Sequence, residues 1–260
     1  MFPDFKFLGM SLYEICFCIG IITALVIFRI IAEKKSASAK IQNFILINAC
    51  ISIIAGYCSA VLFQAVYNYF DSGIFEVTKN TGATFLGGLI GGVVVFLLVY
   101  YIFGYFYFKD KEHIVFTPWL LSLAGAAISG AHAFGRLGCF FVGCCYGIEV
   151  KGFWGVFMNG KEVLPVQLFE SIFLFLLCGV LLFLQIKKAD FKTGLPIYMI
   201  TYGVWRFFIE YLRGDERGKF VVKFLSPSQF QSLILILSGI IIFILMVRIY
   251  GKEKNNNLKN

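Results

Sequence analysis

The sequence predicts an all-α integral membrane protein with about seven transmembrane helices, an outward N-terminus and a cytoplasmic C-terminus. Of its 260 residues, 59% are hydrophobic and 15% are charged, whereas about a quarter of the residues in a soluble domain are charged. The mean hydropathy is +0.83. The polar residues are too few to cover a core of this size in water. The lipid bilayer is therefore the expected solvent.

Seven apolar runs approach the roughly 20 residues that a helix needs to cross a bilayer. We expect one polytopic domain over residues 1–250 and a polar, disordered cytoplasmic tail over 251–260. No small-residue cleavage site follows the first run, so we expect that run to stay in the mature protein. The runs cover residues 11–31, 41–66, 86–108, 114–133, 166–186, 194–212 and 229–249.

Basic residues collect in the breaks on one side of the predicted bundle, and positive loops face the cytoplasm. These breaks hold 13 of the 23 lysines and arginines and cover residues 29–40, 109–111, 187–192 and 248–259. The loops at 67–85, at about 134–165 and at 213–228 then face outward. The net charge of +8 accordingly indicates contact with anionic lipid headgroups and not with nucleic acid.

The segment "GGLIGG" places Gly87 four residues before Gly91 and Gly88 four residues before Gly92. Small residues at this spacing let two helices approach closely in lipid. Close packing is therefore the simplest interpretation of this motif.

The sixth run carries a polar stripe in "TYGVWRFFIEYLRGDERG". Tyr202, Arg206, Glu210 and Arg213 recur at steps of four, four and three residues, which places them on one helical face. Ionisable groups in membrane segments are costly and usually face protein, water or a ligand. A structural Arg206–Glu210 pair with basic side chains that extend to the interface is the alternative.

Two other runs carry polar groups near the same outward end. If the fourth helix continues through "SGAHAFGRLGC", His132, Arg136 and Cys139 also share one face. The fifth run begins with Gln167 and Glu170 at helical spacing. An arginine can hold a phosphate through two parallel hydrogen bonds. We therefore expect an anionic lipid headgroup at this end, with its tails along the apolar flank.

Four blocks in order resemble the prolipoprotein diacylglyceryl transferases: "FLGGLIGG", "GRLGCFFVGCCYG", "LPVQLFE" and "YGVWRFFIEYLRGD". A late "SPSQFQSL" resembles the start of the family's last helix. Members of this family move a diacylglyceryl group from phosphatidylglycerol to the lipobox cysteine thiol of a preprolipoprotein, and glycerol phosphate leaves. The resemblance implies that Arg136 and Arg206 bind the phosphate and that Tyr202 and Glu210 act beside them. It also matches Gln167 and Glu170 to a glutamine and a glutamate of the family. We expect substrate contacts for Gly87, Gly88, Gly135, Gly138, Gln167, Glu170, Arg213, Cys139 and Cys144.

The chain departs from the family pattern at several positions where the family has polar groups that can transfer protons. Leu86 stands where the family usually has a histidine, and Leu164 stands where it has another. Cys139, Val142 and Cys144 replace two asparagines and a glutamate of the signature. We therefore expect His132 or Glu210 to accept the proton of the incoming thiol, although a packing role is open for His132.

Four interpretations fit Cys139, Cys144 and Cys145, and we favour packing in a Gly-rich turn. A disulfide between Cys139 and either neighbour is possible on an oxidising side. A metal site with His132 is another, but H-x6-C-x4-C-C matches no standard zinc pattern, and we expect neither a metal nor another cofactor. A covalent nucleophile beside an arginine is the fourth.

We therefore predict a multi-pass transferase of the bacterial inner or cytoplasmic membrane, with its active site toward the outer face. Its expected partners are phosphatidylglycerol, a lipobox-containing preprolipoprotein and membrane lipid. The outward segment "FWGVFMNGKEV" at 153–163 suits a strand or short amphipathic turn that contacts the acceptor. The alternatives are a paralogue with another acceptor, a non-catalytic lipid-binding protein, and a transporter or channel.

Overall fold

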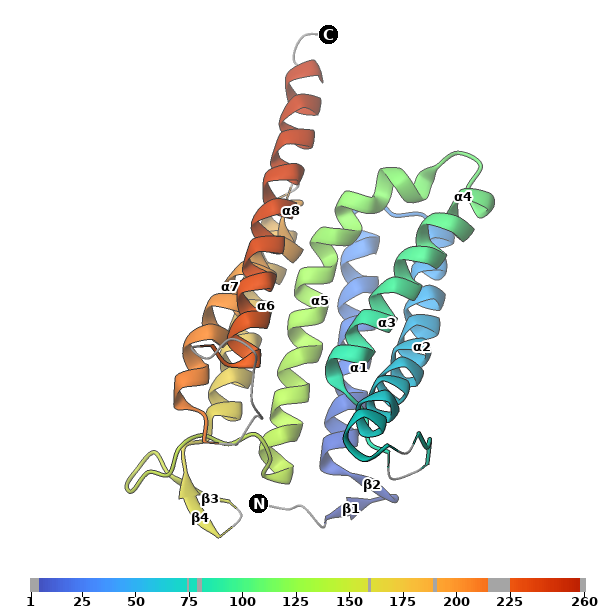
Figure 1. Cartoon of the computed structure of the whole chain (residues 1–260). Helices are drawn as coiled ribbons and strands as arrows, with labels where there is room; N and C mark the ends of the chain where they lie inside the picture. Colours follow the sequence, from blue (N-terminus) through green and yellow to red (C-terminus); the bar gives the residue numbers. More distant parts are fainter. Residues whose placement is uncertain are drawn as a thin grey trace. The chain divides into compact units, whose positions relative to one another are not determined.

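A computed structural model describes residues 5–73, 75–78, 81–158, 160–188, 191–214 and 225–257 of the protein (Figure 1). Each of the seven predicted runs is helical. The helices are α1 (Leu12–Lys34), α2 (Ala39–Ser72), α3 (Phe85–Leu98) with α4 (Gly104–Tyr107), α5 (Glu112–Val142), α6 (Val166–Lys187), α7 (Gly194–Ile209) and α8 (Pro227–Asn257). A π-helical turn, Val99–Phe103, joins α3 to α4, and a 3-10 turn, Glu210–Leu212, follows α7.

Six helical segments in the described part of the chain are long and apolar enough to span a membrane, which confirms a helical membrane protein. The remaining predicted run, 194–212, differs in length. Its α-helix α7 has 16 residues, fewer than the roughly 20 that cross the hydrocarbon core. The helix with the richest polar stripe is therefore also the shortest of the predicted spans.

Two predicted boundaries were wrong. Helix α5 continues to Val142, so the following loop begins at residue 143 and not near 134. Gly143 then adopts a φ of 75°, the left-handed conformation that commonly ends a helix. At the other boundary, α8 continues to Asn257, where we expected disorder from residue 251, because no proline interrupts the segment.

Two short hairpins accompany the helices. Strands β1 (Lys6–Phe7) and β2 (Met10–Ser11) pair antiparallel before α1. Strands β3 (Val156–Met158) and β4 (Lys161–Val163) pair antiparallel before α6, with Val156 opposite Val163. The second hairpin supplies a strand within 153–163, which was one of the two alternatives expected there.

The chain forms two compact units, residues 35–117 and residues 1–34 with 118–260. In the unit of residues 35–117, α2 and α3 pack through glycines. A Cβ on Gly56 would lie 3.0 Å from the carbonyl oxygen of Gly88, and a Cβ on Gly88 would lie 3.2 Å from Cβ of Ala60. The Ser59 hydroxyl also donates to the Gly87 carbonyl at 2.9 Å. The close approach predicted from "GGLIGG" is confirmed, and substrate contact for Gly87 and Gly88 stays a prediction.

The other unit is built around a core between α5, α6 and α7. Hydroxyls tie α5 to α6, because Ser129 donates to the Leu174 carbonyl and Ser171 to the Ala133 carbonyl, both at 2.9 Å. Gly138 lets α1 approach α5, since a Cβ there would lie 3.1 Å from Cβ of Cys16. The buried core comprises Ala126, Ala133, Leu174, Leu177, Leu181 and Tyr198.

Several chain segments meet at one end of this unit (Figure 1). Helices α1, α6 and α8 begin there, α5 and α7 end there, and the β3–β4 hairpin lies beside them. Polar groups from the ends of four helices are thereby brought together at the edge of an apolar bundle.

Candidate active site

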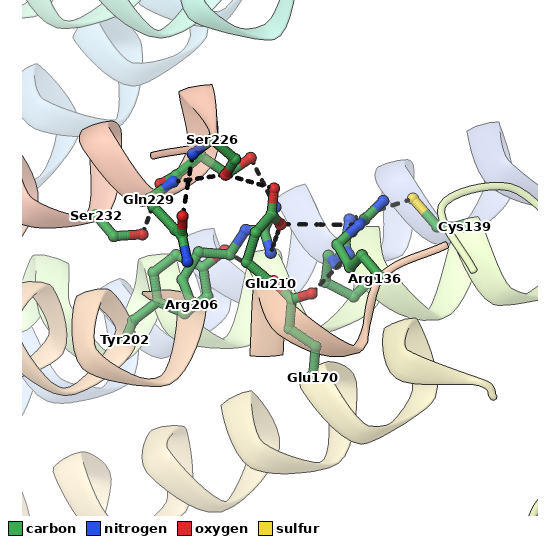
Figure 2. Close-up of polar contacts among 11 residues, drawn as sticks. Arg136, Cys139, Glu170, Tyr202, Arg206, Glu210, Ser226, Gln229 and Ser232 are labelled. Atoms are coloured by element: carbon green, nitrogen blue, oxygen red, sulfur yellow. Dashed lines mark hydrogen bonds and ion pairs between the residues drawn. The ribbon is translucent and has the colours of Figure 1, made fainter. Parts of the chain in front are cut away.

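A buried ion pair joins α5 to α6 at this end (Figure 2). Nη2 of Arg136 lies 2.5 Å from Oε2 of Glu170, and their side chains are 13% and 1% exposed. The Tyr202 hydroxyl of α7 donates to Oε1 of Glu170 at 2.8 Å. Glu170 therefore connects two of the residues predicted to act at the site, and both of its oxygens are engaged.

A second buried pair follows the predicted stripe of α7. Nη1 of Arg206 lies 2.8 Å from Oε2 of Glu210, with side chains 11% and 7% exposed. Nε of Arg213 lies 4.0 Å from the same carboxylate oxygen. Nη2 of Arg206 donates to the Ser228 hydroxyl at 2.9 Å. The spacing of four and three residues thus gives the predicted cluster, although Glu210 already lies in the 3-10 turn after α7.

The start of α8 contributes residues that the sequence analysis did not assign to the site. The Ser226 hydroxyl accepts from the backbone N–H of Gln229 at 3.1 Å, while Oε1 of Gln229 accepts from the N–H of Ser226 at 3.0 Å. This reciprocal pair is a capping box, with Pro227 at the first helical position. The Ser226 hydroxyl also donates to Oε1 of Glu210 at 2.8 Å. The S-P-x-Q spacing was a readable signal for this cap.

Aromatic rings support the same site from behind. Nδ1 of His132 lies 3.0 Å from the Tyr198 hydroxyl. The His132 ring packs edge-on against Tyr202 with centroids 4.6 Å apart, and Tyr198 stacks on Tyr202 at 5.8 Å. Tyr198 was missed, although it stands four residues before Tyr202 on the predicted stripe.

Arginines outnumber glutamates in the described part of this network. Arg136, Arg206 and Arg213 carry three positive charges, and Glu170 and Glu210 carry two negative ones. Buried charge is costly unless it is compensated. An arginine-rich arrangement of this kind suits an anionic ligand, such as a phosphodiester.

The three cysteines of the signature segment lie together at the end of α5. Their Sγ atoms are all within 4.8 Å of one another, and all three thiols are free. Nη1 of Arg136 lies 3.9 Å from Sγ of Cys139. Hydrogen bonds from the thiols of Cys139 and Cys144, and then from Arg213, lower the pKa of the Cys145 thiol. The disulfide that was one of four interpretations of these cysteines is not formed, because all three thiols are free.

The remaining predicted residues fall into different surroundings. Nε2 of buried Gln167 donates to the Cys144 carbonyl at 3.2 Å and contacts Sδ of Met158 in β3 at 3.3 Å. Gln167 thus ties the cysteine segment to the hairpin. A Cβ on Gly135 would meet no atom within 4 Å, whereas Gly138 packs on α1. The basic residues that follow the stripe in the sequence, Arg217, Lys219 and Lys223, lie outside the described residues.

Comparison with known proteins gives a consistent result over almost the whole chain. A family model described as prolipoprotein diacylglyceryl transferase matches residues 3–245. The phosphatidylglycerol–prolipoprotein diacylglyceryl transferase of Clostridium tetani is 32% identical over 253 residues, covering 92% of this chain and 95% of the relative. The corresponding enzyme of Clostridioides difficile is 32% identical over 248 residues, covering 92% of each chain. The chain belongs to the prolipoprotein diacylglyceryl transferase family.

Proposed function

We propose that the protein transfers a diacylglyceryl group from phosphatidylglycerol to the lipobox cysteine thiol of a prolipoprotein. The observation that carries this proposal is the buried guanidinium of Arg136, whose Nε has no hydrogen-bond partner among the described residues. A phosphodiester headgroup supplies both an acceptor oxygen and a negative charge. The names of the C. tetani and C. difficile relatives contain the same donor and acceptor.

Arg136 is the first candidate to bind the phosphate. Its Nε is buried and has no hydrogen-bond partner among the described residues, and an unmade hydrogen bond on a buried charged group is costly. A phosphate oxygen would satisfy it. Arg206 lies beside the Ser228 hydroxyl, so a phosphate there meets a guanidinium and a neutral donor together.

The lipid tails need an apolar surface next to the charged end. On α7 and the turn that follows, Val204, Phe208 and Tyr211 are 42%, 63% and 66% exposed, while Arg206 and Glu210 of the same stretch are buried. Such a division suits a headgroup held inside the unit and acyl chains that lie along its outer face in the bilayer.

The reaction is a displacement at a glyceryl carbon. The acceptor thiol loses its proton, its sulfur forms a bond to the glyceryl carbon, and the carbon–oxygen bond to phosphate breaks. The electron pair of that bond leaves with glycerol phosphate. Arginines that hold the phosphate stabilise the charge that develops on it. His132 and Glu210 are the proposed proton acceptors, and both belong to the hydrogen-bonded network of the site.

The site end is proposed to face outward in a bacterial cytoplasmic or inner membrane. The basic breaks between helices support this orientation, because positive segments remain in the cytoplasm. Reporter fusions at the C-terminus and within the 153–163 segment test it. The C-terminal fusion should report the cytoplasm and the loop fusion the outside, and the reverse result would exclude this orientation.

Transfer itself is tested with purified protein, phosphatidylglycerol labelled in its acyl chains and a lipobox peptide. We expect label on the cysteine peptide and none on a peptide with serine in its place. Arg136→Ala should abolish labelling while the protein remains folded. Label that stays on lipid with the wild-type protein would contradict the proposed reaction.

A further inference from the structure

The cysteine cluster contains three sulfur atoms whose mutual distances approach those found in a metal site. The Sγ atoms of Cys139, Cys144 and Cys145 all lie within 4.8 Å of one another. Zinc–sulfur bonds of about 2.3 Å place two sulfurs of a tetrahedral site roughly 3.8 Å apart. A closure of about 1 Å or less therefore brings the three thiols to metal-binding distances, whereas a disulfide needs about 2 Å between two sulfurs.

The backbone holds this cluster in place from both sides. The N–H of Cys144 donates to the Cys139 carbonyl at 3.1 Å, and Cys145 itself has a φ of 61°, which is unusual for a residue other than glycine. Gly147 pairs with Arg213, so the far end of the segment is fixed to the chain after α7. Three thiols are thus presented by a turn that two other segments restrain.

Two arginines lie beside the cluster. The guanidinium of Arg136 contacts Cys139 at 3.9 Å, and Arg213 donates to Cys145. Three thiolates around a divalent ion carry a net negative charge, which two arginines offset. Soft thiolate ligands select zinc and similar thiophilic ions over calcium or magnesium.

Three ligands leave one coordination position open. His132, the fourth partner considered from the sequence, bonds instead to the Tyr198 hydroxyl and is not part of this group of ligand atoms. Cys139 is buried, whereas Cys144 and Cys145 are half-buried, so the outer side of the cluster is accessible. Zinc sites with three protein ligands and an open position are typically catalytic.

We propose that Cys139, Cys144 and Cys145 bind one thiophilic divalent metal ion, with zinc as its probe, and that the open position takes the acceptor's lipobox thiol. This inference rests on the proposed transfer for the identity of the acceptor. It also gives a physical reason for three neighbouring cysteines at this site, because a thiol that binds such an ion is deprotonated outright.

The proposed step is balanced without a redox partner. The acceptor thiol displaces water from the open position and releases its proton to His132 or Glu210, through water. Its sulfur then forms the bond to the glyceryl carbon while the carbon–oxygen bond to phosphate breaks, and glycerol phosphate leaves with the electron pair. The thioether product dissociates and water returns. Cys139 lies beside Arg136, so the activated thiol and the phosphate-binding arginine are adjacent.

Metal binding is measured first, on the full-length protein in lipid nanodiscs under reducing conditions. After removal of bound metal by a chelator, we expect uptake of one zinc per chain in competition with a chromophoric chelator. Cobalt in place of zinc should give a sulfur-to-cobalt charge-transfer band. Absence of zinc uptake, or a cobalt spectrum without that band, would overturn the site with no need for a variant.

Single variants Cys139→Ser, Cys144→Ser and Cys145→Ser should each weaken zinc binding by roughly 100-fold or more, because each removes one ligand. Cys58→Ser, an exposed cysteine of α2, is the matched control and should bind zinc like the wild type. Uptake by the triple variant that equals the control would also overturn the site.

The open position is tested with the acceptor. A lipobox peptide should intensify and shift the cobalt band, because a fourth thiolate joins the ion, and the serine peptide should not. An unchanged spectrum would overturn the acceptor's place in the site.

Activity separates the two proposals. Chelated protein should lose transfer and regain it with zinc. Zinc and thiol binding with no transfer would refute the proposed function and leave the site intact. Full transfer by the metal-free protein would refute the role of the metal and leave the function intact.

Discussion

Two Arg–Glu pairs with the same spacing occupy very different surroundings. Arg29 and Glu33 of α1 lie 2.7 Å apart with side chains 45% and 56% exposed. Arg206 and Glu210 lie 2.8 Å apart with side chains 11% and 7% exposed. The second pair is extended by hydrogen bonds to Ser228 and Ser226. Identical local spacing therefore gives a surface pair in one place and a candidate site in the other.

The difference lies in what the rest of the chain adds. An exposed i,i+4 pair is screened by solvent and contributes about 0.3–0.5 kcal/mol. A buried pair must recover the cost of removing two charges from water, and it does so through additional hydrogen bonds. The cost of burying these charges at the edge of an apolar bundle is offset when a charged ligand binds there.

The largest expected effect separates Glu170 from Glu33. Glu170→Ala leaves the Arg136 charge buried and unpaired, so we expect a loss of about 3–5 kcal/mol in the free energy of unfolding. Glu33→Ala removes one partner of the exposed Arg29 and should cost about 0.5 kcal/mol. Unfolding in mixed micelles measures both. Equal losses would show that the burial of the Arg136–Glu170 pair has no energetic consequence.

A smaller effect is expected from the helix caps. Ser226→Ala removes the cap of α8 and should cost about 1 kcal/mol of stability, together with a several-fold fall in transfer because Glu210 loses a hydrogen bond. Ser38→Ala removes the cap of α2, where the side chain accepts from Ile41, at a similar cost. Transfer by the Ser38 variant should be unchanged. If both variants lose transfer alike, the α8 cap has no special relation to the site.

The smallest effect distinguishes two buried tyrosines. Tyr198→Phe removes the hydrogen bond to His132 and should cost about 1 kcal/mol, with a modest change in the pH profile of transfer if His132 accepts the proton. Tyr100→Phe removes a hydrogen bond to the His113 carbonyl at a comparable cost. A pH profile of transfer serves as the readout. Identical profiles for Tyr198→Phe and the wild type would argue against a proton-accepting role for His132.

Sequence reasoning predicted the features that depend on spacing within one helix. The period of the stripe placed Tyr202, Arg206 and Glu210 together, and the conditional extension of α5 correctly placed Arg136 on the helix. Pairing between helices has no such period. The bond of Arg136 to Glu170 therefore became visible only when α5 and α6 were packed.

Residues without charge were the ones missed. Ser226 and Ser228 lie at the start of α8. The S-P-x-Q spacing indicates the helix cap, but it does not indicate that these hydroxyls contact Glu210 and Arg206 of another segment. The meeting of Cys139, Cys144 and Cys145 depends on the left-handed backbone of Gly143 and Cys145. A turn of that kind at a cysteine is rarely expected from sequence.

The central claim is that the arginine of the buried Arg206–Glu210 pair binds the phosphate of the leaving group. The arginine of the exposed Arg29–Glu33 pair does not. The most direct measurement compares transfer from labelled phosphatidylglycerol to a lipobox peptide by Arg206→Ala and Arg29→Ala proteins in the same nanodiscs. We expect Arg206→Ala to lower the rate by about 10²–10³, as loss of a transition-state donor does. Arg29→Ala should retain the wild-type rate. Equal rates for the two variants would contradict the account.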